Sequence, residues 1–131
     1  MHLKPLLKAE ITLAPIQELG EGWRGRRRMI AITGGRFHGE RLSGEVLEGG
    51  ADWQVVRPDG VLELDAQYML KTADGALIHV HNRGYRHESF MRTTPRFETG
   101  DARYAWLNRI VCVASGQRHP SSVELEVFEV Q

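Results

Sequence analysis

A regular alternation of side chains between Leu62 and Lys71 constrains the fold of this chain most strongly. Every second residue is apolar or aromatic, and most residues between them are charged or carry an amide. Successive side chains of a β-strand point to opposite faces, so this pattern gives one buried face and one wet face. The preceding Pro58-Asp59-Gly60 favours a turn, because proline presets φ and glycine accepts a positive φ. A short β-prone run containing Trp53 comes before the turn, so the whole segment predicts a β-hairpin.

The same alternation recurs along the chain. We expect further strands near residues 5–14, 26–33, 41–47, 76–82, 90–98, 104–114 and 123–130. Loops are expected at 15–25, 83–89 and 116–122. Pro95 lacks an N–H donor, so we expect part of the 90–98 strand to lie at a sheet edge. No ten-residue window has convincing helical periodicity, so we expect at most a single turn of helix.

About eight to nine strands with short connections predict a sandwich or a closed barrel. We favour closure because it removes sheet edges, and the glycines at 34, 35, 39, 44, 49 and 50 suit a strongly coiled sheet. The expected fold is all-β: a single antiparallel β-barrel, lipocalin-like, with little or no helix. With 131 residues we expect one domain, spanning 1–131. A barrel of this size has room inside for side chains or one small ligand.

The charge balance bears on partners and location. Lys and Arg number 17 and Asp and Glu number 17, whereas strong nucleic-acid binding usually needs a basic excess. We therefore expect no nucleic-acid partner. The N-terminus lacks the hydrophobic core of a signal peptide, and no apolar run is long enough to span a membrane. Cys112 is the single cysteine, so it has no partner for an internal disulfide. A cytoplasmic location with no membrane partner is the expectation, and Cys112 is expected to be an inert, buried thiol.

His79 and His81 share one face of an expected strand, with His87 and Glu88 following them. Two imidazoles so placed are used in zinc and iron sites. However, they lie opposite the apolar Ile78 and Val80, which favours solvent-facing histidines. We expect purified protein to carry no stoichiometric metal, and we expect no cofactor.

Other sequence motifs for catalysis or phosphate binding are absent. No Gly-x-Ser-x-Gly elbow, phosphate-binding loop or dinucleotide fingerprint is present. The basic run from Arg24 to Arg28 could form an anion site, but zero net charge favours the solvated start of a strand.

Several polar and aromatic residues share the parity of the apolar strand positions. We expect Tyr68, Asn82, Trp106 and Asn108 to point into the barrel, joined by Trp53 from the hairpin. Aromatic walls with a few amides are typical of a small-molecule pocket. Buried Asn and Tyr that satisfy neighbouring backbone groups are an equally good interpretation.

A second group of charged residues lies near strand ends: Asp52, Asp65, Arg83, Arg92 and Glu98. A carboxylate beside arginine keeps a low pKa and is a poor base near neutral pH. Charge pairing at the barrel rims is therefore the first interpretation, with Asp65 and Glu98 as the candidate acid or base if the protein is an enzyme.

Taken together, several motifs resemble the domain-of-unknown-function 3237 family over about residues 5–130. They are Thr33-Gly34-Gly35-Arg36-Phe37, Gly49-Gly50-Ala51-Asp52-Trp53-Gln54, Arg57-Pro58-Asp59-Gly60, Asn82-Arg83-Gly84, the run from Arg92 to Asp101, and Tyr104-Ala105-Trp106-Leu107-Asn108. The resemblance implies a compact antiparallel β-barrel that forms oligomers, and it assigns no role to the matching residues. Those residues are Asp52, Trp53, Asp65, Asn82, Arg83, Arg92, Glu98, Trp106 and Asn108.

Two departures from the family pattern stand out. The segment between Asn82-Arg83-Gly84 and Phe90 is shorter here than in the family, so any lid formed there is cut back. His79 and His81 also stand where the family pattern has Tyr and Arg. A histidine metal site is therefore not expected to be a shared feature of the family.

Two functions follow as hypotheses. In the first, the lumen binds a small aromatic or carboxylate-bearing metabolite, with or without cofactor-free isomerisation, cyclisation or hydration. Its ligand-binding candidates are Asp52, Trp53, Tyr68, Asn82, Arg83, Arg92, Trp106 and Asn108. In the second, a packed barrel without a cavity serves as a structural or self-association module. Either hypothesis is compatible with a homodimer or higher homo-oligomer.

Overall fold

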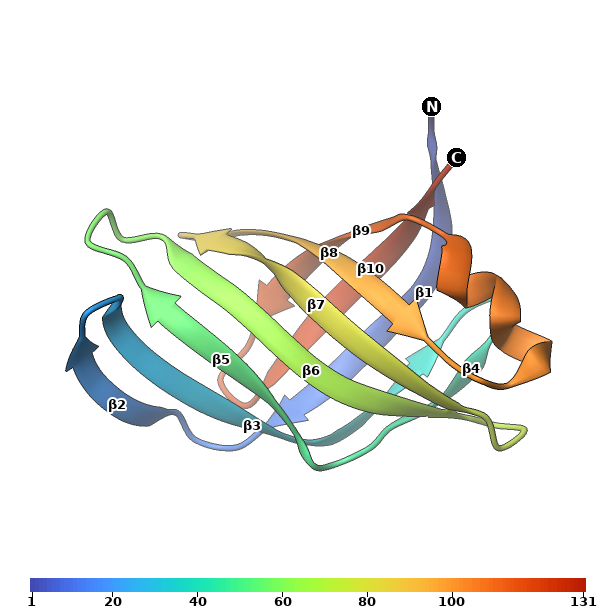
Figure 1. Ribbon diagram of the computed structural model, residues 1–131, viewed down its shortest axis with the longest axis horizontal. Coiled ribbons are helices and arrows are strands. Elements are labelled where there is room, and N and C mark those ends of the chain that lie inside the picture. Colours follow the sequence, from blue (N-terminus) through green and yellow to red (C-terminus); the bar gives the residue numbers. More distant parts are fainter.

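The computed structural model describes residues 1–131 and consists of ten β-strands and one short helix (Figure 1). The strands are β1 (Leu3–Leu13), β2 (Gln17–Gly22), β3 (Gly25–His38), β4 (Ser43–Val46), β5 (Gly50–Val56), β6 (Leu62–Thr72), β7 (Leu77–His87), β8 (Phe90–Glu98), β9 (Cys112–Arg118) and β10 (Ser122–Val130). The 3₁₀ helix η1 (Ala102–Arg109) lies between β8 and β9. The structure thus confirms the all-β class.

The sheet closes into an antiparallel barrel with eight positions in its wall. From β1 the ring runs through β10, β9, β8, β7 and β6 to β3, which pairs with β1 again. β4 and β5 share one position, since both lie between β3 and β6, and β2 lies outside the ring and pairs only with β3. The predicted Pro58-Asp59-Gly60 turn joins β5 to β6, where Gly60 has φ of 85°.

Alternation of side chains fills the barrel, as the sequence predicts. On β7, Ile78 and Val80 are 0% and 1% exposed, while the intervening His79 faces outward. The apolar positions of β1, β6 and β10 follow the same rule and join one continuous core. Burial of these apolar surfaces is the main stabilising contribution to the barrel.

One end of the barrel is covered by η1 (Figure 1). Leu107 of this helix is 1% exposed and belongs to the core, and Asp101 caps the helix by accepting a hydrogen bond from the Arg103 amide. The prediction of a strand over 104–114 is wrong for 104–111, because β9 begins only at Cys112, and the helix is longer than the single turn expected. The alternating apolar residues around Trp106 resemble a strand locally, but the Asp101 cap and packing of Leu107 over the barrel end stabilise a helix instead.

Three strands extend through segments expected to be loops. Residues 17–22 form β2, β7 continues to His87, and β9 continues to Arg118. These stretches are polar, so they lack the apolar signal of a strand, yet each pairs with a neighbour that fixes its backbone. They make the barrel longer at the end opposite η1.

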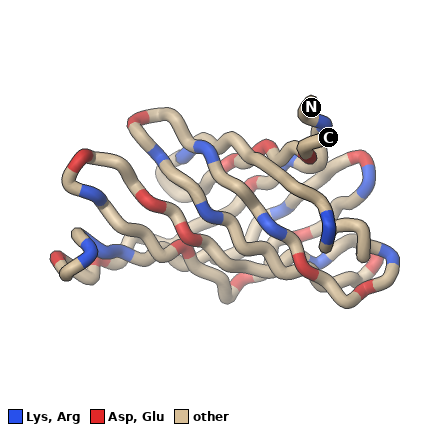
Figure 2. The backbone as a smooth tube through the Cα atoms, turned by 45° about the horizontal axis from the view of Figure 1, so that its top comes forward, with Lys and Arg blue, Asp and Glu red and all other residues tan.

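The surface carries both signs of charge. Figure 2 shows Lys and Arg interspersed with Asp and Glu along the strands. The helix of this structure is too short and too polar to cross a membrane.

Candidate functional site

A cavity occupies the lumen at the end opposite η1. Its volume is about 60 Å³. Apolar residues such as Ile11, Ile30 and Leu125 form part of its wall, and the polar lining consists of Arg28, Asp52, Gln54, Tyr68, Asn82, Arg86, Thr93 and Arg118.

The strand register explains how this polar lining assembles. Asp52 on β5 pairs with Ile30 on β3 and Ala66 on β6, and Ala66 pairs with Asn82 on β7. Asp52 and Asn82 therefore stand in one row across the wall, with only the small Ala66 between them. A large side chain at position 66 would fill the space that separates them.

Asp52 is held by two hydrogen bonds. Gln54 donates from Nε2 to Asp52 Oδ2 at 2.7 Å, and the Asp65 backbone amide donates to Oδ1 at 3.0 Å. Burial raises the pKa of Asp52 above its ordinary value, and the two hydrogen bonds only partly offset this effect. A carboxyl with a raised pKa exchanges protons at a pH closer to neutrality than an ordinary aspartate does, which suits acid–base chemistry.

Tyr68 lies in the lumen on β6 and is buried. Burial, and secondarily the charge of Asp52, raise the pKa of its phenol, so the hydroxyl stays protonated and can donate a hydrogen bond. Gly50 provides the space for this side chain, because a Cβ there would lie 2.5 Å from Tyr68 Cβ.

Two buried oxygens in the lumen have no hydrogen-bond partner in the protein: Asn82 Oδ1 and Thr93 Oγ1. Both residues line the cavity. Because an unpaired buried polar group is costly, such atoms are candidates for contact with water or a ligand.

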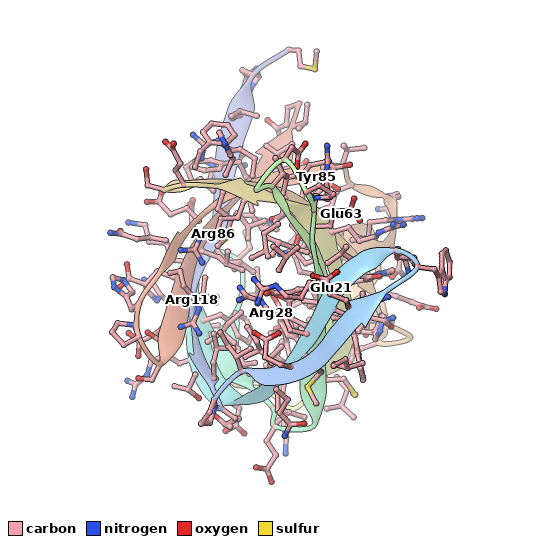
Figure 3. All side chains as sticks on the ribbon, turned by 90° about the vertical axis from the view of Figure 1, so that its left-hand side faces the viewer. Glu21, Arg28, Glu63, Tyr85, Arg86 and Arg118 are labelled. Atoms are coloured by element: carbon pink, nitrogen blue, oxygen red, sulfur yellow. The ribbon has the colours of Figure 1, made fainter.

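The open end of the lumen is bordered by three arginines from three strands (Figure 3). Arg28, Arg86 and Arg118 belong to β3, β7 and β9 and are half-buried. Arg28 Nε donates to Gln54 Oε1 at 2.7 Å, which links this mouth to Asp52 through the Gln54 amide.

The cavity is smaller than the few hundred cubic ångströms typical of a whole small-molecule site. A volume of about 60 Å³ has room for a few water molecules or one functional group of a ligand. Any larger ligand has to extend into the mouth between the arginine side chains.

Three predicted site residues point outward. Trp53 is 46% exposed, and Arg83 and Arg92 are exposed on the outer faces of β7 and β8. The expectation that Trp53 lines the lumen is therefore wrong: it alternates with the inward Asp52 and Gln54. Arg92 instead places its guanidinium carbon 4.1 Å from the ring centroid of Phe90.

Trp106 and Asn108 belong to η1 and lie outside this cavity. Trp106 is partly buried against the core, whereas Asn108 is exposed, contrary to the inward position expected of it. The Trp106 ring stacks against Arg41, whose guanidinium carbon is 3.5 Å from the ring centroid. Asn108 bonds the backbone of Thr99 twice: Oδ1 accepts from the amide at 2.8 Å, and Nδ2 donates to the carbonyl at 2.9 Å. Asn108 thereby fastens η1 to the end of β8.

The candidate acid–base residues Asp65 and Glu98 lie on the outer surface. Asp65 Oδ1 pairs with His81 Nε2 at 2.7 Å, and His79 Nε2 is 3.0 Å from Gln67 Oε1. The two histidines therefore face solvent, as their strand parity predicts, and each contacts a β6 side chain.

Arg28, Gln54, Arg86, Thr93 and Arg118 are the lumen residues that sequence reasoning missed. Parity could have found all three arginines: Arg28 alternates with Ile30 inside the expected strand, and longer strands would place Arg86 with Asn82 and Arg118 with Ala114. The zero net charge favours a solvated start of the strand at 24–28, and Arg86 and Arg118 lie in the expected loops.

Comparisons with family models, known sequences and solved structures all identify the same family. The family described as "Protein of unknown function (DUF3237)" matches residues 1–89 and 87–130, and the chain belongs to it. A UPF0311 protein from Rhodopseudomonas palustris is 38% identical, over 90% of this chain and 89% of its own length. The crystal structure of a β-barrel-like protein from Acinetobacter baumannii AYE has a TM-score of 0.96 and 38% identity, covering 99% of this chain and 96% of that one.

A more distant relative carries a described activity. "Hydroalkoxylation enzyme phnH" from Penicillium herquei is 28% identical over 109 residues, which is 83% of this chain and 70% of the relative. The crystal structure of an enzyme from Penicillium herquei has a TM-score of 0.83 and 25% identity, covering 99% of this chain and 94% of that one.

Proposed function

We propose that this DUF3237 protein catalyses a cofactor-free addition of a hydroxyl group across a carbon–carbon double bond in the barrel lumen. The observation that carries the proposal is the Asp52 carboxyl, which lines the cavity and has a raised pKa because of burial. The described hydroalkoxylation activity of the Penicillium herquei relative supports the same reaction class.

The proton balance of this reaction suits a single carboxyl group. The O–H bond of the hydroxyl and the π bond of the alkene break, while one C–O bond and one C–H bond form. Asp52 donates a proton to carbon and accepts the proton that the hydroxyl loses, so it ends the cycle in its starting state. No electrons are transferred to or from the substrate, and no redox partner is required.

The neighbouring groups have distinct roles. Tyr68, kept protonated, and the Thr93 hydroxyl donate hydrogen bonds to substrate oxygens, and Asn82 Oδ1 accepts one from a second donor of the ligand. The proton of the reacting hydroxyl is left for Asp52. Gln54 orients Asp52 through its 2.7 Å hydrogen bond. Because the cavity is small, only the reacting end of the substrate reaches into it beside Asp52, while the rest of the substrate lies in the mouth.

The test is turnover of simple hydroxyalkenes in D₂O. With 2-allylphenol and 4-penten-1-ol as neutral probes and 3-allyl-4-hydroxybenzoate as an anionic probe, the wild-type protein is expected to produce a cyclic ether carrying one deuterium on carbon, detected by mass spectrometry and NMR. The Asp52→Asn variant is expected to be slower by about 100-fold or more, the usual contribution of a positioned general acid or base.

The matched control is Asp59→Asn, which removes a carboxylate from the exposed β5–β6 turn. It is expected to turn over like wild type. Equal rates for Asp52→Asn and wild type, or no deuterated ether from any hydroxyalkene of the panel, would contradict the proposal.

The small cavity favours a second candidate, a non-catalytic barrel that self-associates through its outer strands. A cavity of about 60 Å³ is well below the volume of a typical ligand site, and Leu3, Val111 and Phe90 are exposed apolar residues that such an interface could use. Sedimentation measurements showing a stable oligomer, together with no turnover and no melting-point response to small molecules, would favour it.

A further inference from the structure

Three arginine side chains meet at the mouth of the lumen without forming a salt bridge. Arg28, Arg86 and Arg118, here named the arginine cluster, come from three different strands and meet at the open end of the barrel (Figure 3). None of the three takes part in a salt bridge, although Arg26 on the same strand as Arg28 pairs with Glu18 at 3.1 Å.

Neutral oxygens hold these guanidinium groups in place. Arg28 Nε donates to the Gln54 side chain, Arg86 Nε donates to the Glu88 carbonyl at 3.3 Å, and Arg118 Nη1 donates to the carbonyls of His119 and Ser122. A guanidinium has five N–H donors, so each arginine keeps donors for another partner. The charges are thus positioned but not neutralised.

The arginines also repel one another. Burial is the main cause that lowers the pKa of Arg28, and Arg26, Arg86 and Arg118 lower it further, while Glu18 opposes the shift. Burial and then Arg86 lower the pKa of Arg118, and Asp52 opposes that shift. An anion bound between them would relieve both the repulsion and the loss of hydration.

We propose that the arginine cluster binds a compact oxyanion of the substrate, a carboxylate or a phosphate monoester. Planar guanidinium groups suit both, because two parallel N–H donors match two oxygens. That the bound anion is part of the substrate rests on the proposed function. The substrate class is then an anionic hydroxyalkene.

The register sets the spacing between the anion and the reacting group. Ile30 pairs with Asp52, and Arg28 is two residues from Ile30 along β3. Two residues of a strand span about 7 Å. The oxyanion is therefore expected to lie about one aromatic ring away from the carbon that Asp52 protonates, with the ring between mouth and cavity.

Binding is tested with two anionic probes and a neutral amide that matches the carboxylate probe in shape. Isothermal titration at low salt compares 3-phenylpropanoate, phenyl phosphate and the neutral 3-phenylpropanamide. The anionic probes are expected to bind at least tenfold more tightly than the amide, and added salt should weaken only the anions. A preference for the carboxylate or for the phosphate assigns the anion.

Variants connect this binding to the mouth. Arg86→Gln and Arg118→Gln are each expected to weaken anion binding about tenfold or more, the value of a charge-assisted hydrogen bond. The control Arg96→Gln removes an outward arginine on β8 and should bind like wild type. Circular dichroism of each variant establishes that it is folded.

The inference would be overturned if the amide bound as well as the acids, or if the two mouth variants bound like Arg96→Gln. Asp52→Asn separates this outcome from failure of the proposed function. It is expected to lose turnover but to bind the anionic probes at least as tightly as wild type, because it removes a negative charge that acts on Arg118. Anion binding without turnover in the wild-type protein would contradict the proposed addition reaction and leave the anion site standing.

Discussion

Gln54 connects Asp52 to Arg28 by two hydrogen bonds of 2.7 Å, donating to the carboxylate and accepting from the guanidinium. The amide group therefore separates the two charges that would otherwise form an ion pair. A direct ion pair would hold the pKa of Asp52 low. With Gln54 between them, burial dominates and the pKa of Asp52 is raised.

The raised pKa predicts how stability depends on pH. Folding makes Asp52 bind its proton more tightly than the unfolded chain does, so the stability of wild type relative to Asp52→Asn should fall as pH rises through the window above the ordinary aspartate value of 3.8. The loss is about 1.4 kcal/mol for each unit by which folding raises the pKa. Urea unfolding of both proteins over a pH series measures it.

Asp59 supplies the control of opposite sign. Its pKa is lowered, chiefly by the hydrogen bond from the Val61 amide, so wild type should lose stability relative to Asp59→Asn as pH falls. If the stability of wild type relative to Asp52→Asn instead rose with pH, Asp52 would be ion-paired in the folded protein.

Thr93→Val is expected to stabilise the barrel. Thr93 Oγ1 is buried without a partner, so replacing the hydroxyl by a methyl group should raise the free energy of unfolding by about 1 kcal/mol. The control is Thr72→Val, because Thr72 Oγ1 accepts from the Ala76 amide at 2.8 Å and its loss should destabilise by about 1–3 kcal/mol. Chemical denaturation distinguishes the two, and equal destabilisation would mean that Thr93 is hydrogen-bonded in solution.

Gly50→Ala is expected to disturb the lumen by steric overlap. The new Cβ would lie 2.4 Å from the Gln67 carbonyl oxygen and 2.5 Å from Tyr68 Cβ. Strand separation or a shift of Tyr68 should cost about 1–3 kcal/mol in thermal or urea unfolding. Gly100→Ala, where a Cβ meets nothing within 4 Å, should change stability by less than about 0.5 kcal/mol. Equal stability of Gly50→Ala and Gly100→Ala would contradict the close approach of Gly50 to β6.

Asn108→Ala tests whether this residue fastens η1 or contacts a ligand. Removing both hydrogen bonds to Thr99 should lower the free energy of unfolding by about 1–3 kcal/mol, because the Thr99 backbone loses its partners. Binding of 3-phenylpropanoate should stay within twofold of wild type. A large loss of affinity with unchanged stability would restore Asn108 as a ligand-binding residue.

The fold could be predicted from the sequence because alternation and turn residues report strands directly. Leu62–Thr72 is the clearest case, since one face meets a core and the other meets solvent. The same parity argument correctly placed Tyr68 and Asn82 inside. It failed at 104–109, because the capping of η1 and its packing over the barrel end are tertiary effects that a local pattern does not contain.

The arginine cluster shows a different limit. Polar residues that line a lumen look like solvent-facing residues, because the hydrophobic signal that identifies an inner face is absent. Arg86 and Arg118 therefore lie in expected loops, and the sequence favours a solvent-facing position for Arg28. Only closure of the barrel, which brings β3, β7 and β9 to one mouth, shows that they share a site.

The titration of Asp52 tests the central claim most directly. The carboxyl carbon of Asp52, assigned by comparison with Asp52→Asn, can be followed by ¹³C NMR over a pH series. A pKa clearly above 3.8 is the predicted result, and a further rise in Gln54→Leu, which loses a hydrogen bond that lowers the pKa, is expected as well. A pKa at or below 3.8 would mean that Asp52 is an ordinary or ion-paired carboxylate, and the acid–base role assigned to it would be wrong.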